Sequence, residues 1–227
     1  MQTEGISFKK VKQNCKMILS RFAEIPREKE GKVKVGVVGE IYVKYSPLGN
    51  NNLEQFLTDE GAEVVVPGLL DFFMYCIVSN ISDIELYGLH KIRKPALDFV
   101  FKYLQKQQNE IIGLMKADGN FTPPTPISHT MELIKDFMGF GTKMGEGWLL
   151  PAEMLELNDE GVHNIVCTQP FGCLPNHIAG RGMLNKIKEI AENANILPID
   201  YDSSASKVNQ ETVSYTHLRA HETVLDL

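Results

Sequence analysis

The stretch Val33-Lys34-Val35-Gly36-Val37-Val38-Gly39 decides the fold class, because its β-branched apolar residues are typical of a buried strand. Asparagines 50–52 offer side-chain caps for a helix that starts near Leu53, and a second apolar strand follows at 63–66. A strand, a helix and a strand in this succession form a βαβ unit with parallel strands. The sequence therefore predicts an α/β fold.

The remaining chain continues the alternation. Helical patterns follow Gly68 and Pro95, further helices and strands are then expected, and the Gly- and Pro-rich residues 118–128 form a loop. The later expected elements are helices at 131–137 and 149–155, a strand at 162–167, a helix at 183–191 and a strand at 196–199. We predict a Rossmann-like parallel sheet with flanking helices, or two sheets in two lobes if the loop at 118–128 divides them.

The domain organisation follows from shifts in the pattern. Residues 1–30 comprise an amphipathic helix and a linker, and residues 31–211 form the Rossmann-like α/β region. Residues 212–227 continue no periodicity and resemble translated vector sequence, so we expect them to be a foreign tail outside the fold.

Composition excludes several classes of protein. The chain of 227 residues has a net charge of −6 and scattered Lys and Arg, so it lacks the basic stripe of a nucleic-acid-binding protein. The longest apolar run, 64–78, is interrupted by Pro67, Gly68 and Asp71, which argues against a membrane span. Four cysteines are too few for a disulfide scaffold, and no secretory signal is visible, so we expect a cytoplasmic protein.

Two cysteines, Cys167 and Cys173, bracket a loop that ends at His177 and follows a predicted strand. Their spacing is wider than that of a zinc-finger pair and suits an iron–sulfur cluster that takes further ligands from elsewhere. The alternative is a pair of reduced thiols, one packed and one idle. His177 either donates a hydrogen bond to a cluster sulfur or caps the next helix.

The other cysteines differ in their surroundings. Cys76 follows the aromatic-rich residues 72–75, an apolar setting typical both of a low-potential cluster and of any buried helix. Cys15 belongs to the apolar stripe of the first helix, which indicates a packing role.

Glycines at 139–147 suggest a second kind of site. Their backbone amides could hold a phosphate with help from Lys143, but the spacing matches no nucleotide-binding motif, and tight packing is the alternative. Glu40 is expected at the carboxyl edge of the sheet, either near a ligand or in solvent. Tyr42 and Tyr45 are equally compatible with rim positions and with substrate contacts.

Several segments together resemble one family, the 2-hydroxyacyl-CoA dehydratase superfamily, and most closely the C-terminal region of its acyl-CoA dehydratase activase-related proteins. The resemblance extends over about residues 8–210. The segments that carry it are 36–45, 49–52, 66–73, 145–150 and 167–177.

The resemblance implies an oxygen-sensitive, anaerobic iron–sulfur protein with a [4Fe–4S] cluster, or with the double-cubane variant of related proteins. It implies Cys167, Cys173 and Cys76 as metal-binding, cofactor-binding residues, with His177 beside them. In such systems an ATP-hydrolysing activator passes an electron to the cluster, and a thioester substrate then loses water through a ketyl radical. The expected partners are that activator module or a dehydratase subunit.

The sequence departs from the full family pattern because it lacks the nucleotide-binding activator modules, so we expect a fragment. The expected function is iron–sulfur electron transfer, with lyase or ATP-coupled reductase activity only in the intact protein. The alternatives are a non-catalytic α/β scaffold that docks a partner, and a metal-free enzyme that binds a nucleotide or thioester.

Overall fold

One four-stranded parallel sheet organises the protein, and the computed structural model describes residues 8–27 and 31–202. The strand order is β2-β1-β3-β4, with every neighbouring pair parallel. The strands are β1 (Lys34–Gly39), β2 (Glu63–Val65), β3 (Asn164–Pro170) and β4 (Asn195–Tyr201). The predicted α/β fold with a Rossmann-like parallel sheet is therefore confirmed. Because strands from both sides of residues 118–128 pair in one sheet, this segment does not separate two sheets.

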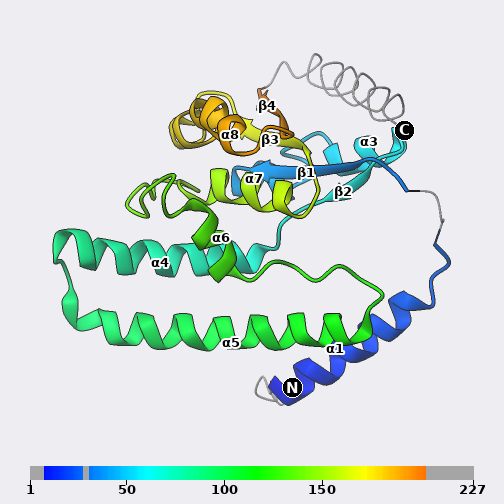
Figure 1. The fold of residues 1–227 in the computed structure, drawn as a ribbon, viewed down its shortest axis with the longest axis horizontal. Helices are drawn as coiled ribbons and strands as arrows, with labels where there is room; N and C mark the ends of the chain where they lie inside the picture. The colour runs from blue at the N-terminus through cyan, green and yellow to red at the C-terminus, as the bar shows by residue number, and fades with distance from the viewer. Residues whose placement is uncertain (1–7, 28–30, 203–227) are drawn as a thin grey trace.

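Helices cover both faces of the sheet and add a further helical layer. Figure 1 shows α7 against the sheet, α4 and α5 as an antiparallel pair beyond it, and α1 beside α5. The helices are α1 (Phe8–Ala23), α2 (Ile41–Tyr45), α3 (Leu53–Asp59), α4 (Leu69–Tyr87), α5 (Lys94–Asp118), α6 (Ile127–Ile134), α7 (Leu149–Asp159) and α8 (Leu184–Ile190), with short turns η1 (Lys91–Arg93), η2 (Asn176–Gly180) and η3 (Arg181–Met183).

The hydrophobic core has two parts, one on each face of the sheet. Alternate residues of β1 point to opposite faces, so Val35 and Val37 pack with α3 while Val38 packs with α7. Gly36 allows α7 to approach closely, because a Cβ at this position would lie 2.6 Å from Leu157 Cδ1. The middle of β3, residues 165–167, is also apolar on both faces, as expected of a strand buried in a parallel sheet.

Three details differ from the sequence prediction, and one prediction lies outside the described residues. Helix α2 was not expected, and β3 continues three residues past the predicted end at Cys167. The loop after β3 leads into a π-helical turn, η2, that periodicity does not signal. The predicted foreign tail, residues 212–227, lies outside the described residues.

Candidate functional site

The point where the sheet changes direction lies between its two central strands. The chain moves outward from β1 to β2 on one side and from β3 to β4 on the other, so the carboxyl ends of β1 and β3 flank a topological switch point. Gly39 ends β1 with φ +141°, and a Cβ there would lie 1.9 Å from the Thr168 carbonyl oxygen. The backbones therefore approach one another closely just before both chains leave the sheet, where α/β proteins place their ligands.

Cys173 lies in the turn that follows β3, where it is half-buried. Its backbone N–H donates to the Pro170 carbonyl over 3.1 Å, and its Sγ accepts a hydrogen bond from Asn176 Nδ2 at 3.1 Å. Asn176 is fully buried, yet its Oδ1 has no hydrogen-bond partner among the described residues. A buried acceptor without a partner costs about 1–3 kcal/mol, so such atoms mark candidate functional positions.

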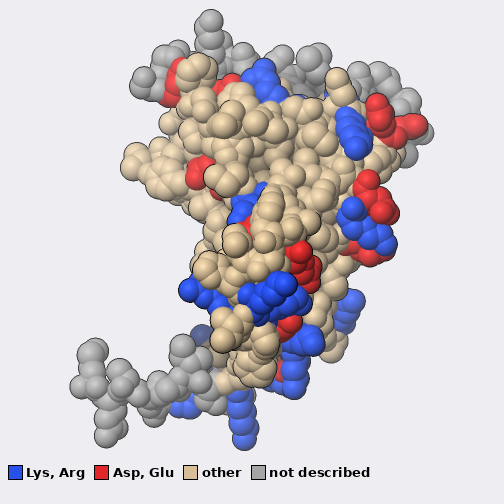
Figure 2. Space-filling model, turned by 90° about the vertical axis from the view of Figure 1, so that its left-hand side faces the viewer, with Lys and Arg blue, Asp and Glu red and all other residues tan. Residues whose placement is uncertain are grey.

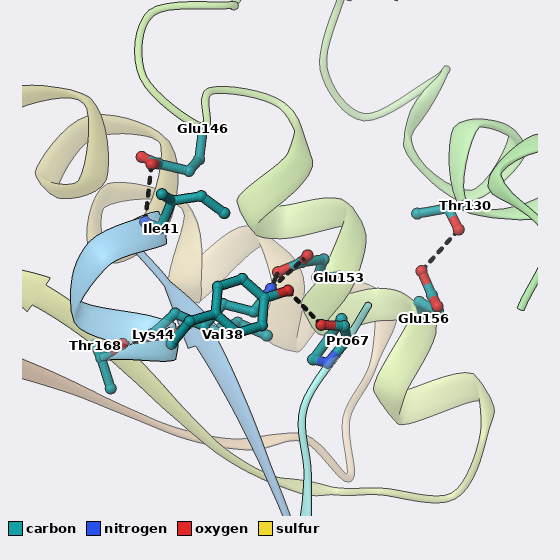
Figure 3. Close-up of polar contacts among 10 residues, drawn as sticks. Val38, Ile41, Lys44, Pro67, Thr130, Glu146, Glu153, Glu156 and Thr168 are labelled. Carbon is teal, nitrogen blue, oxygen red and sulfur yellow. Dashed lines mark hydrogen bonds and ion pairs between the residues drawn. The ribbon is translucent and has the colours of Figure 1, made fainter. Parts of the chain in front are cut away.

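Glu146 connects this turn to the first strand. Its Oε1 accepts a hydrogen bond from Ile41 N at 3.0 Å, at the start of α2 (Figure 3), and Asn176 Nδ2 lies 3.5 Å from its Oε2. The side chain is buried, and burial raises the pKa of its carboxyl despite these hydrogen bonds. Glu146 therefore holds three segments of the site together: α2, η2 and the loop before α7.

Cys76 lies on α4 and packs against the core on the α7 side of the sheet. The thiol is half-buried, and its pKa is raised first by burial and then by the charge of Glu146. Cys173 is linked to Glu146 through Asn176, whereas the charge of Glu146 raises the pKa of both Cys76 and Cys167. Of Cys76 and Cys173, Cys173 is the one with a hydrogen-bonded link to Glu146 at the switch point.

Cys167 and Cys173 lie in different environments. Cys167 lies inside β3, is fully buried in the core on the α7 side of the sheet, and has a pKa that burial raises to about 12. A Cβ at Gly180 would lie 3.4 Å from its Sγ, which shows how closely η2 covers it. The sequence predicts Cys167 as an iron ligand, but its enclosed position favours a packing role. Cys15 belongs to α1, a helix that lies beside α5 and away from the sheet (Figure 1).

His177 supports the backbone of the cysteine turn. Its Nδ1 lies 2.8 Å from the Cys173 carbonyl oxygen, and its Nε2 lies 3.5 Å from Asp200 Oδ1. Arg181 Nη1 donates to the other oxygen of Asp200 at 3.0 Å. The side chain that reaches the Cys173 sulfur is therefore Asn176, one position before the histidine. Sequence reasoning missed Asn176 and Glu146.

A cavity of about 530 Å³ opens at this edge of the sheet. Glu40, on its wall, caps α2, because its Oε2 accepts a hydrogen bond from Val43 N at 2.9 Å. Tyr201 is another wall residue, and its buried hydroxyl has no partner among the described residues. The lining residues are Glu40, Tyr42, Val43, Leu48, Gly49, Asn51, Pro170, Cys173, Tyr201 and Asp202. Cys173 thus borders a space large enough for a small ligand.

The glycine-rich loop at 139–147 is fixed by side chains of α4. Tyr75 Oη donates to the carbonyl oxygens of Lys143 and Gly145 at 2.7 and 2.9 Å, and the Lys143 amine pairs with Asp83. Gly147 has φ +39°, and a Cβ there would lie 2.1 Å from the Thr142 carbonyl oxygen. These contacts support the tight-packing interpretation, because the amine proposed for a phosphate already has an anionic partner.

A buried ion pair lies beneath the site. Lys44 of α2 and Glu153 of α7 are both almost fully buried, and Lys44 Nζ lies 2.7 and 2.9 Å from the two carboxylate oxygens (Figure 3). Beside them, Tyr45 Oη donates to the Pro67 carbonyl at 2.5 Å, so Tyr45 has a structural partner. Tyr42 remains exposed on the cavity wall. The pair fixes α2, and with it Glu40 and Ile41, against α7.

No family model, curated protein or solved structure matches the chain. Within residues 8–27 and 31–202, no group of three or more His, Cys, Asp or Glu side chains is placed to hold a metal ion. In the same residues, none of the helices combines the length and apolarity that a membrane crossing needs. The side chains at the switch point are therefore the basis of a functional proposal.

Proposed function

We propose that the chain is an iron–sulfur electron-transfer component related to 2-hydroxyacyl-CoA dehydratases and their activase-related proteins. The observation that carries this proposal is the position of Cys173 at the topological switch point, where its half-buried sulfur accepts a hydrogen bond from Asn176 and borders the cavity. Thiolates are the ligands of iron–sulfur clusters, and the position is the one where open α/β sheets hold cofactors.

The chemistry of the residues fits such a group in part. Cys173 and Cys76 are partly accessible, and Asn176 aims an amide donor at the Cys173 sulfur, as hydrogen-bond donors do around cluster sulfurs. The enclosed Cys167 fits a ligand role poorly. A bound [4Fe–4S] cluster, or a double-cubane variant, would accept and release single electrons at low potential.

The proposal extends to the setting in which the protein works. The proposed location is the reducing cytoplasm, and an oxygen-sensitive cluster requires anaerobic conditions. The proposed partner is either an ATP-hydrolysing activator module, which would deliver the electron, or a dehydratase subunit, which would receive it. Lyase or reductase activity would belong to the intact assembly.

Anaerobic reconstitution with iron and sulfide tests this function. We expect a brown protein with bound iron, and we expect the Cys173→Ser variant to lose most of that iron, because a neutral hydroxyl is a poor substitute for a thiolate. The matched control is Cys15→Ser. This cysteine lies on α1, so its substitution should leave the iron content unchanged. A wild-type protein that binds no iron under these conditions would contradict the proposal.

A further inference from the structure

The turn that joins α4 to α5 exposes large apolar side chains. Residues 85–93, which we call the hairpin tip, are all exposed, although the two helices that they join contact each other. Ile92 is 92% exposed, Tyr87 is 65% exposed, and Leu86 and Leu89 are exposed to a similar extent as Tyr87. Several large apolar side chains gathered on one exposed segment mark an interaction surface for a protein or a membrane.

Basic side chains lie beside these apolar ones. Lys91 and Arg93 flank Ile92 in the sequence, and both are exposed. Lys94, the next basic residue, pairs instead with one carboxylate of α4 and one of α5. The hairpin tip thus combines cationic and aliphatic side chains within one short segment.

The outer face of α5 continues this combination. Phe99 is 71% exposed, Tyr103 is 49% exposed, and Lys102 and Lys106 are exposed beside them. These four residues are spaced by three and four positions, so they lie on one side of the helix. Tyrosine and lysine have an apolar body and a polar end, and such side chains suit the boundary between water and lipid.

Helix α1, which contacts α5, has a basic surface of its own. The protein as a whole has a net charge of −6, but the charged residues of α1 are all basic: Lys9, Lys10, Lys12, Lys16 and Arg21. Its apolar residues Met17, Ile18 and Phe22 are also exposed. Figure 1 shows α1 and α5 along the lower edge of the molecule, with the hairpin tip at the left end. Figure 2, viewed from that end, shows Lys and Arg gathered over the lower half. We call α1, the hairpin tip and α5 the basic helical layer.

We propose that the basic helical layer docks on an anionic membrane surface, with the hairpin tip inserted between the lipid headgroups. The inference goes beyond the proposed function and does not require a bound cluster. Lys and Arg are attracted to anionic headgroups, and apolar side chains enter the boundary between headgroups and acyl chains. The contact stays at the surface of the bilayer, because no helix within residues 8–27 and 31–202 is both long and apolar enough to cross it.

The aliphatic side chains of the tip distinguish a lipid surface from other partners. The phosphates of a nucleic acid would pair with the basic residues but would leave Leu89 and Ile92 in water. A second copy of the chain, seated on the tip about a two-fold axis, would bring Lys91 and Arg93 close to the same residues of its partner. A protein partner needs a pocket of matching shape for the apolar side chains, whereas a bilayer accepts them in any arrangement. An anionic bilayer therefore suits both kinds of side chain.

Vesicle sedimentation of the full chain, without iron, tests the docking. We expect binding to vesicles of phosphatidylglycerol and phosphatidylcholine in equal parts, and binding to phosphatidylcholine alone that is weaker by about tenfold or more, because several basic residues then lose their attraction. Absence of binding to both vesicles, or equal binding to both, would overturn the proposal. Since the protein carries no cluster in this assay, either result leaves the proposed iron–sulfur function standing.

Two variants assign the contact to the hairpin tip. Ile92→Ser should weaken binding to the anionic vesicles about tenfold, because an apolar side chain no longer leaves water. Lys91→Gln should weaken it about fivefold through the loss of one charge. The matched controls are Ile190→Ser and Lys188→Gln, which change exposed residues of α8 and should leave binding unchanged. All four positions are exposed, so the fold is kept, which circular dichroism verifies. Unchanged binding in either tip variant would overturn the assigned surface.

The variant Ile92→Trp measures insertion of the tip. The sequence contains one tryptophan, the fully buried Trp148, so a change in emission on addition of vesicles reports the new side chain. We expect a shift of the emission to shorter wavelength and quenching by lipids with brominated acyl chains. Binding without either change would show a contact through charge alone, as on an acidic protein, and would overturn insertion into lipid.

Discussion

Asn176 Nδ2 lies 3.1 Å from Cys173 Sγ, while the Oδ1 atom of the same buried amide has no partner among the described residues. The amide thus donates directly to the sulfur of the candidate site. His177 instead contacts the Cys173 carbonyl oxygen. The two adjacent residues therefore act on different atoms of one cysteine, and their effects can be separated.

The first prediction separates these two residues in the reconstituted protein. Asn176→Ala should keep the iron and move the reduction potential to a more negative value, because the lost donor stabilised the more negative, reduced state. A hydrogen bond of about 1 kcal/mol corresponds to about 40 mV for one electron. His177→Ala should produce a smaller change. Redox titration followed by electron paramagnetic resonance measures both, and a larger shift for His177→Ala would refute this assignment.

The second prediction concerns the ion pair beneath the site. Lys44→Met leaves the Glu153 carboxylate buried without its cation and should lower the free energy of unfolding by about 3–5 kcal/mol. The double variant Lys44→Met, Glu153→Leu should recover much of that loss, because neither charge is then buried. Urea denaturation measures each value. Equal losses in the single and double variants would show that packing, and not charge, dominates here.

The third prediction is a pH dependence that arises from Glu156. Its side chain accepts a hydrogen bond from Thr130 Oγ1 at 2.7 Å, and burial, with the nearby Glu153, Asp71 and Glu160, raises its pKa to about 8. The folded protein holds this proton while the unfolded chain releases it above the ordinary value of 4.5, so stability falls as pH rises from about 4.5 to about 8. The slope from this group is about 1.4 kcal/mol per pH unit.

Glu156→Gln should remove that slope, because an amide does not titrate in this range. The remaining slope should come from the other buried carboxyl groups whose pKa burial raises, among them Asp71, with a pKa of about 6. The exposed Glu54 provides the control substitution Glu54→Gln, which should leave the profile unchanged. Thermal unfolding between pH 5 and 9 supplies the measurement; an unaltered slope in Glu156→Gln would assign the effect to other groups.

The fourth prediction compares two glycines with positive φ. Gly61 has φ +88° and open space around its Cβ position, so Gly61→Ala should cost only the left-handed backbone, about 1–2 kcal/mol. Gly39→Ala adds a clash with the Thr168 carbonyl and should cost clearly more, because backbone at the switch point must move. Chemical denaturation of both variants checks the order. Similar losses would mean that β1 and β3 can separate there without penalty.

The strands were predictable because burial on both faces of the sheet requires apolar residues at successive positions. Both faces of the segment with the valines of 33–38 are apolar, and so are both faces of the residues before Cys167. An internal strand of a parallel sheet buries both faces of such a segment. Helix α2 was less visible, since it is short and its signal is one carboxylate, Glu40, three residues before Val43. Its cap becomes recognisable only once the end of β1 is known.

The candidate site was only partly predictable, for a physical reason. Cys167 and Cys173 are close in sequence, but Cys167 still belongs to β3 and points under α7, whereas Cys173 follows the strand. Glu146 contacts Ile41 from a loop 105 residues away, a contact that no local pattern encodes. The position of the cysteine turn was therefore predictable from the sequence. The side chains that surround the Cys173 sulfur depend on the tertiary fold and were not predictable.

The most direct test of the account is the iron-to-protein ratio of the Cys76→Ser, Cys173→Ser double variant after anaerobic reconstitution. The matched control is the Cys15→Ser, Cys167→Ala double variant, which also removes two of the four thiols, one on α1 and one enclosed in the core. We predict almost no iron in the first protein and wild-type iron in the second. Full iron retention in the Cys76→Ser, Cys173→Ser protein would contradict the assignment of the site.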